Sequence, residues 1–175
     1  MLSTAALADE TYLAVDGLVT NSTCAVENTH GRVEVDMGKN SVNALNALAK
    51  GTPSLTQNFN INLKECPASY RSLTTGELFS NVAVTFVGGG ANVEDGNLKN
   101  IADGFRAENL QVQISDVNGK VDLSKADASS HLQALVKDGE ARGDIQFDFK
   151  ADYVRTGLVT PGIFHSHIPF KVDYK

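Results

Sequence analysis

The sequence contains no tryptophan and only two methionines, two cysteines and four prolines among its 175 residues. No apolar run approaches the roughly 20 residues that a helix needs to cross a bilayer, which argues against a helical membrane protein. Basic residues are also few, because 21 acidic residues outnumber 15 lysines and arginines and leave a net charge of −6. Such a chain is poorly suited to nucleic acid or to an anionic membrane as its main partner.

The spacing of apolar and turn-forming residues indicates one all-β domain. The length is sufficient for one domain with a substantial core. Valine, threonine, asparagine and glycine are abundant, and turn residues recur about every ten positions, as is typical of a β-sandwich. Alternation of apolar and polar residues predicts strands at 11–26, 33–35, 57–66, 82–87, 110–114, 121–123, 145–153 and 164–174. We interpret these strands as a Greek-key sandwich.

The connecting segments have weaker patterns. Residues 41–50 have a nearly helical apolar spacing that ends at Gly51 and Pro53, which predicts a short helix. The polar segment 91–108 is rich in glycine, asparagine and aspartate, so we expect a surface loop. Asn118-Gly119 predicts a hairpin turn. Residues 129–137 fit either a short helix or an irregular strand.

The last predicted strand raises a question of pairing. From Phe164 to Tyr174 every second residue is mostly apolar, whereas the residues between them include two histidines, a lysine and an aspartate. This period of two is typical of a half-buried strand. A long apolar strand at the edge of a sheet is an aggregation hazard that soluble proteins normally avoid. We therefore expect an earlier segment of the chain, or another molecule, to cover it.

The first eight residues have the composition of the end of a signal peptide. They are small and apolar, and they finish in Ala6-Leu7-Ala8, an A-x-A cleavage pattern. We interpret residues 1–8 as the remnant of a signal peptide, which implies an exported protein that begins near Asp9. The alternative is an ordinary frayed N-terminus.

The two cysteines fit an exported protein. Cys24 and Cys66 lie far apart and outside any C-x-x-C or metal-ligand spacing. Two cysteines in an exported β-domain most simply form one disulfide. The alternative is a pair of buried free thiols in a cytosolic protein.

No group of residues in the sequence predicts a catalytic centre. His165-x-His167 places two imidazoles on one strand face, but no third zinc ligand is suggested nearby, so a solvated face is favoured. Gly88-Gly-Gly90 lacks the Lys-Ser/Thr of a phosphate-binding loop and is interpreted as a turn. The acidic residues are dispersed. We expect no enzyme activity, no cofactor and no metal.

Four motifs in chain order carry a resemblance to a known family. They are Gly-Leu-Val-Thr-Asn-Ser-Thr-Cys-Ala-Val at 17–26, Phe-Asn-Ile-Asn-Leu-Lys-Glu-Cys at 59–66, Val-Gln-Ile-Ser-Asp-Val-Asn-Gly at 112–119, and a C-terminal signature over 149–175. In the last of these the penultimate residue is aromatic, Tyr174, and a glycine, Gly162, stands fourteenth from the end. From residue 9 to residue 175 the chain resembles the structural subunits of chaperone–usher pili, in particular the type 1 fimbrial major pilins.

The resemblance implies an incomplete immunoglobulin-like sandwich that lacks its final strand and is completed by a donor strand. Residues 20–175 would form the pilin domain, and residues 9–19 would form an N-terminal extension that inserts into the next subunit. The implied donor side chains are Thr11, Leu13, Val15, Gly17 and Val19. The implied acceptor groove and chaperone-binding strand contain Gly162, Phe164, Ile168, Phe170, Val172 and Tyr174.

The same resemblance implies partners and a destination. The partners would be other copies of this chain or related pilins, a periplasmic chaperone and an outer-membrane usher. The protein would pass through the periplasm to the cell surface and build a fimbria that supports adhesion. Two alternatives stay open: a minor adaptor or tip pilin that binds a ligand, and a self-complemented monomeric periplasmic binding domain or enzyme.

Overall fold

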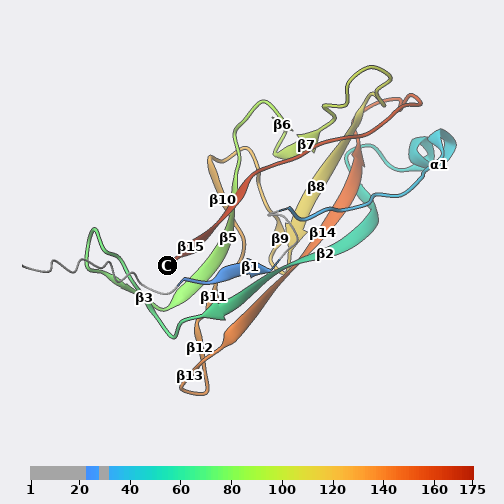
Figure 1. Cartoon of the computed structure of the whole chain (residues 1–175). Helices are drawn as coiled ribbons and strands as arrows, with labels where there is room; N and C mark the ends of the chain where they lie inside the picture. Colours follow the sequence, from blue (N-terminus) through green and yellow to red (C-terminus); the bar gives the residue numbers. More distant parts are fainter. Residues whose placement is uncertain (1–22, 28–31) are drawn as a thin grey trace, which may run out of the picture.

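The computed structural model describes residues 23–27 and 32–175, and within them the strands form two main antiparallel sheets that pack together and two small two-stranded sheets (Figure 1). The predicted leader (1–8) and donor segment (9–19) lie outside the described residues. The larger sheet has seven strands, namely β1 (Ala25–Glu27), β2 (Pro53–Cys66), β14 (Gly143–Arg155), β8 (Leu110–Asp116), β7 (Asn97–Lys99), β6 (Val93–Glu94) and β9 (Gly119–Lys120). The smaller sheet has β5 (Asn81–Val87), β10 (Asp127–Ser129), β11 (Gln133–Ala134) and β15 (Phe170–Tyr174).

The long pair β2 and β14 forms the spine of the larger sheet. Its register pairs Phe59 with Phe149 and Ile61 with Phe147. These apolar residues alternate with exposed polar ones, so one face of both strands packs into the core. The alternation that predicted these strands is confirmed, and β2 begins four residues earlier than predicted.

The smaller sheet is built around β5. Residues 82–86 of this strand are all buried on both faces, with exposed fractions of 0–3%. One edge of β5 pairs with β10 and β11, and the other edge pairs with β15. Residues 129–137 are therefore irregular strand, ending in a small hairpin of β12 (Val136–Lys137) and β13 (Glu140–Ala141).

The disulfide and the short helix fix the two ends of the sandwich. Cys24 and Cys66 are joined, as predicted, and both are buried. The crosslink closes a sequence separation of 42 residues, for which the loop-entropy estimate is about 4 kcal/mol of stabilisation. At the other end, α1 (Val42–Ala47) begins at Ser41, whose hydroxyl accepts a hydrogen bond from the Ala44 amide.

Two predictions, the strand at 33–35 and the surface loop at 91–108, are wrong. No strand is assigned at 33–35, because the backbone there makes no sheet hydrogen bonds among the described residues, although Val33 and Val35 still pack against the core. Residues 91–108 are not simply a surface loop, since β6 and β7 lie within them. Asn97 is buried because its amide donates to the Gln111 side chain at 2.8 Å, so its polarity misled the prediction.

The hairpin at Asn118-Gly119 is confirmed by the pairing of β8 with β9. The terminal strand is shorter than the predicted 164–174, because only 170–174 pairs with β5. Pro169 has no amide hydrogen to donate, so the ladder ends with its carbonyl accepting from the Val87 amide at 2.9 Å. Residues 163–165 bond instead to the segment 100–107.

Candidate acceptor surface

The C-terminal segment presents a half-buried apolar row. From Phe164 to Tyr174 the even-numbered residues are all half-buried, and the odd-numbered ones are exposed except Asp173. Phe164, Ile168, Phe170, Val172 and Tyr174 all pack against the core without becoming part of its fully buried set, and we call them the C-terminal row. The strand behind them, β5, is fully buried over 82–86. The segment therefore covers the core only in part.

The outer edge of β15 carries backbone groups that have no strand partner within residues 23–27 and 32–175. Lys175 and Asn81 exchange both amide–carbonyl hydrogen bonds, at 2.9 and 3.0 Å. Hydrogen-bonded pairs alternate along an antiparallel ladder, so residues 171 and 173 also point their backbone groups at β5. The amides and carbonyls of Phe170, Val172 and Tyr174 consequently point away from β5. No strand among the described residues pairs with that edge.

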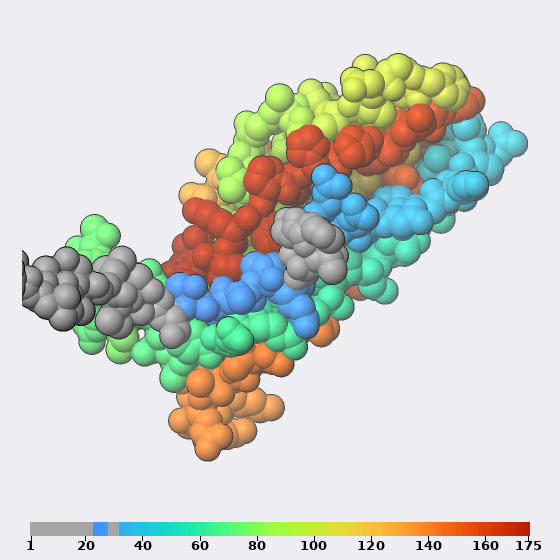
Figure 2. Space-filling view, in the orientation of Figure 1, coloured from blue at the N-terminus to red at the C-terminus, as the bar shows by residue number. Residues whose placement is uncertain are grey.

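A second half-buried row faces the same core from the N-terminal side. Its members, Val26, Val33, Val35 and Met37, pack against the core and alternate with exposed residues. Figures 1 and 2 both place the described residues 32–40, in blue, alongside the red C-terminal segment. Among the described residues, no backbone hydrogen bond joins 32–40 to 161–173. The two rows are therefore neighbours, with no strand of the described part of the chain between them.

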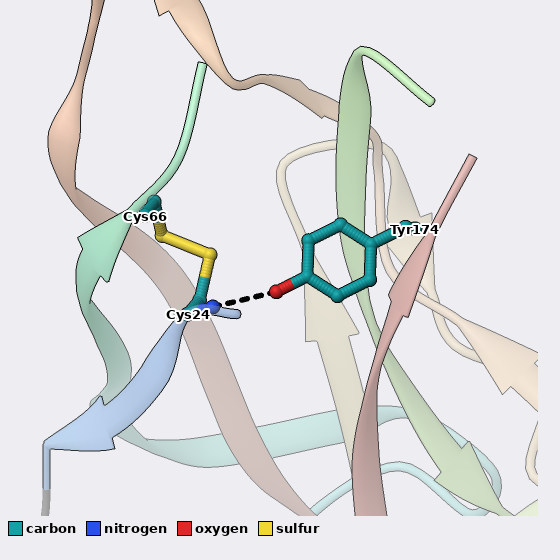
Figure 3. Close-up of a disulfide and its surroundings, with 3 residues drawn as sticks. All are labelled: Cys24, Cys66 and Tyr174. Carbon is teal, nitrogen blue, oxygen red and sulfur yellow. Dashed lines mark hydrogen bonds between the residues drawn. A yellow bond between two sulfur atoms is a disulfide. The ribbon is translucent and has the colours of Figure 1, made fainter. Parts of the chain in front are cut away.

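One end of this surface is closed by aromatic contacts. The Cys24 amide donates to the Tyr174 hydroxyl at 2.6 Å (Figure 3). The Tyr174 ring also stacks on Tyr70, with centroids 4.3 Å apart, in the hairpin of β3 (Tyr70–Arg71) and β4 (Leu78–Phe79). Burial raises the pKa of the Tyr174 phenol above its ordinary value. A cavity of about 480 Å³ lies here, lined in part by Thr23, Phe79 and Val172.

The other end is closed by α1. The Asn46 side chain donates to the Val159 carbonyl at 3.1 Å and accepts from the Val159 amide at 2.8 Å. The Arg155 side chain donates to the Leu48 carbonyl at 3.1 Å. These contacts join the N-terminal and C-terminal segments beyond the two rows.

The wall formed by the C-terminal segment is positioned by a buried asparagine. The Asn100 amide donates to the Ala107 and Ile163 carbonyls at 2.8 and 2.7 Å. Its carbonyl oxygen accepts from the Ala102 and His165 amides at 3.0 Å each. All four hydrogen-bonding positions of the side chain are thus used, and 163–165 is tied to 102–107.

Gly162 allows the C-terminal segment to lie directly against the backbone of residues 106–107. A Cβ at this position would lie 2.2 Å from the Ala107 nitrogen and 2.2 Å from the Arg106 carbonyl carbon. The two backbones approach closely because Gly162 has no side chain. Gly162 therefore lies at the end of the wall and positions it, whereas the five predicted apolar residues form the wall itself.

No catalytic or metal centre emerges from the described residues. His165 and His167 lie on the exposed side of the segment, with ring centroids 6.1 Å apart, and His167 contacts Asn92. Within 23–27 and 32–175, no three His, Cys, Asp or Glu side chains gather in a way that suits a metal ion. No helix in this part of the chain is long and apolar enough to span a membrane.

The structure brings together Cys24, Cys66, Gly162 and all five residues of the C-terminal row. It adds residues that sequence reasoning missed. The alternation at Val26, Val33 and Val35 was visible in the sequence, but it was used only to predict strands and not to predict that these side chains line this surface. Asn100 gave no signal because it stands among many other asparagines, and Tyr70 gave none because its partner, Tyr174, is distant in sequence.

Comparison with known proteins identifies the family. The profile of the fimbrial protein family matches residues 12–175. The chain is 27% identical to the serotype 2 fimbrial subunit of Bordetella pertussis over 195 aligned positions, covering 99% of this chain and 90% of that protein. It is 28% identical to the major fimbrial subunit SMF-1 of Stenotrophomonas maltophilia, covering 97% of this chain and 95% of that protein.

Solved structures give the same fold. The P pilus rod subunit PapA superposes with a TM-score of 0.61 at 18% identity, covering 88% of this chain and 100% of PapA. A subunit of a chaperone–usher pilus superposes with a TM-score of 0.62 at 16% identity, covering 99% and 100%. The predicted immunoglobulin-like pilin sandwich is confirmed. The chain therefore belongs to the fimbrial protein family.

Proposed function

We propose that this protein polymerises by donor-strand exchange, with residues 9–19 of one copy lying between the two half-buried rows of another. The observation that supports this most strongly is the outer edge of β15. At Phe170, Val172 and Tyr174 it combines backbone groups that lack a partner strand among the described residues with half-buried apolar side chains. An added strand would hydrogen-bond with these backbone groups and cover these side chains.

The proposed donor has a complementary pattern. Thr11, Leu13, Val15, Gly17 and Val19 fall on one face of an extended strand. Three of the five are large aliphatic residues, and each contributes roughly 1.5–3 kcal/mol when fully buried, so the donor supplies several kcal/mol in total. The glycine permits a close backbone approach at its position. Insertion also removes the exposed edge of β15, so assembly and completion of the fold are coupled.

The remaining steps of the proposal concern export. A periplasmic chaperone would cover the same surface before assembly, an outer-membrane usher would receive the complex, and the fibre would support adhesion at the cell surface. The chaperone and the donor would compete for one edge, because β15 has a single unpaired side in the described structure.

Deletion of residues 9–19 tests the proposal. The truncated chain retains its acceptor surface, so we expect it to bind a chaperone and to accept a donor while being unable to donate. Electron microscopy of cells that express only this deletant should reveal no fibres. Normal fibres would refute the proposal. Loss of the whole gene separates shaft from adaptor, since a shaft subunit is required for fibre mass and an adaptor is not.

A further inference from the structure

The α1 end of the molecule carries a group of exposed apolar side chains. Phe105, Leu158 and Ile163 are 69%, 72% and 58% exposed, and we call them the head patch. They belong to two loops, 100–109 and 156–163, that lie together at this end (Figure 1). Large apolar side chains that are held outward at neighbouring positions often mark a protein–protein contact.

The loops that carry the head patch are fixed by hydrogen bonds. The Ile163 amide donates to the Phe105 carbonyl at 2.9 Å. The Asn109 side chain donates to the Leu158 carbonyl at 2.8 Å. Since a backbone group of each of the three residues is hydrogen-bonded, the head patch is a preformed surface whose side chains are mostly exposed.

The opposite end carries a second exposed apolar pair, Leu73 and Leu78, which are 73% and 57% exposed. We call them the tail patch. They lie in and beside the β3–β4 hairpin, whose Tyr70 stacks on Tyr174, and the Tyr174 hydroxyl accepts from the Cys24 amide. The tail patch is therefore at the Cys24 end of the molecule.

The direction of insertion decides which ends meet. If a donor segment entered from the Cys24 end of the groove, two copies would meet through identical ends, and mutual exchange would close them into a symmetric pair. If it enters from the Gly162 end, the Cys24 end of each copy meets the Gly162 end of the next. Only this heterologous arrangement extends into a fibre. The donor then runs antiparallel to β15, with Val19 near Gly162.

We propose that the head patch of one copy docks on the tail patch of the copy that donates to it. This inference rests on the proposed function and adds a contact between domain bodies to the contact made by the donor strand. The head patch is continuous with the acceptor surface, because Ile163 directly precedes the first residue of the C-terminal row. The occupant is a second copy of this chain, whose own tail patch arrives there with its extension.

Two measurements on full-length protein separate the body contact from the strand contact. The variants are Phe105→Asp in the head patch, Leu78→Asp in the tail patch and Val117→Asp as a control. Val117 is a suitable control because it is 70% exposed and belongs to neither patch. Binding of a fluorescent peptide of residues 9–19 should be within about twofold of the parent in all three variants. Assembly of whole subunits should be about tenfold weaker for the first two variants and unchanged for the control.

The outcomes are distinct. Equal assembly by the two patch variants and the control would overturn the docking inference and leave donor-strand exchange intact. A peptide that fails to bind the parent protein would overturn both. Crosslinking gives an independent readout, since Cys24 and Cys66 are joined and leave introduced thiols as the reactive ones. A mixture of Phe105→Cys and Leu78→Cys copies should form intermolecular crosslinks in assembled fibres. A mixture of Val117→Cys and Leu78→Cys copies should not. Equal crosslinking in the two mixtures would overturn the inference.

Discussion

Replacing Asn100 with alanine should destabilise the protein by about 4 kcal/mol. The side chain makes four hydrogen bonds of 2.7–3.0 Å with the backbone of Ala102, Ala107, Ile163 and His165. Each such bond contributes roughly 1 kcal/mol net, and an alanine supplies none of them. The site is 8% exposed, so water cannot fully replace the lost partners without rearrangement of the C-terminal segment.

Urea unfolding of the full chain, followed by circular dichroism, measures this loss directly. Asn92→Ala is the matched control. Its amide also contacts the C-terminal segment, but the partners are on exposed His167 and both distances are 3.3 Å. We expect a change of less than about 0.5 kcal/mol for the control. A loss below about 1 kcal/mol for Asn100→Ala would refute the conclusion that this side chain holds the wall in place.

Three further predictions concern the closed end and the wall. Cys66→Ser should lower the free energy of unfolding by about 4 kcal/mol in urea titrations, and a loss below about 1 kcal/mol would contradict the loop-entropy argument. Gly162→Ala should lower the free energy of unfolding by about 1–3 kcal/mol in the same assay, because its Cβ would lie 2.2 Å from the Ala107 nitrogen. Gly90→Ala is the control and should be neutral, because a Cβ there would meet open space. Equal losses of stability in the two variants would contradict the argument. The Tyr174 phenol should titrate above pH 10 in the difference spectrum between parent and Tyr174→Phe, since burial raises its pKa. Because the pKa is higher in the folded than in the unfolded chain, the contribution of this group to stability is present below pH 10 and is lost as the pH rises through the folded pKa. Titration at or below pH 10 would contradict the burial.

The sequence predicted the regular strands well because each follows a strict physical rule. The strands β2, β5, β8 and β14 alternate between core and solvent or lie wholly in the core, and both patterns leave a clear trace in composition. The half-buried alternation of the C-terminal segment was predicted at every even position from 164 to 174. The joining of Cys24 to Cys66 followed from the scarcity of cysteine.

The rest depended on contacts that composition does not reveal. The segment 91–108 looked like a loop because it is polar, yet Asn97 and Asn100 are buried, with their side-chain amides donating to Gln111 and to the Ala107 carbonyl. The terminal strand was predicted too long because its alternation continues through Pro169, while the pairing with β5 does not. Residues 32–37 alternate like a strand, but no strand among the described residues pairs with them. That missing neighbour is the vacancy for which the donor is proposed.

Hydrogen exchange at the edge of β15 tests the central proposal most directly. The amides of Lys171 and Asp173 point at β5, while those of Val172 and Tyr174 point away from it. Addition of a peptide of residues 9–19 to the full chain should slow exchange at residues 172 and 174 by at least about tenfold and change the other two much less. Equal changes at all four amides, or no change at 172 and 174, would contradict the insertion of a donor strand at this edge.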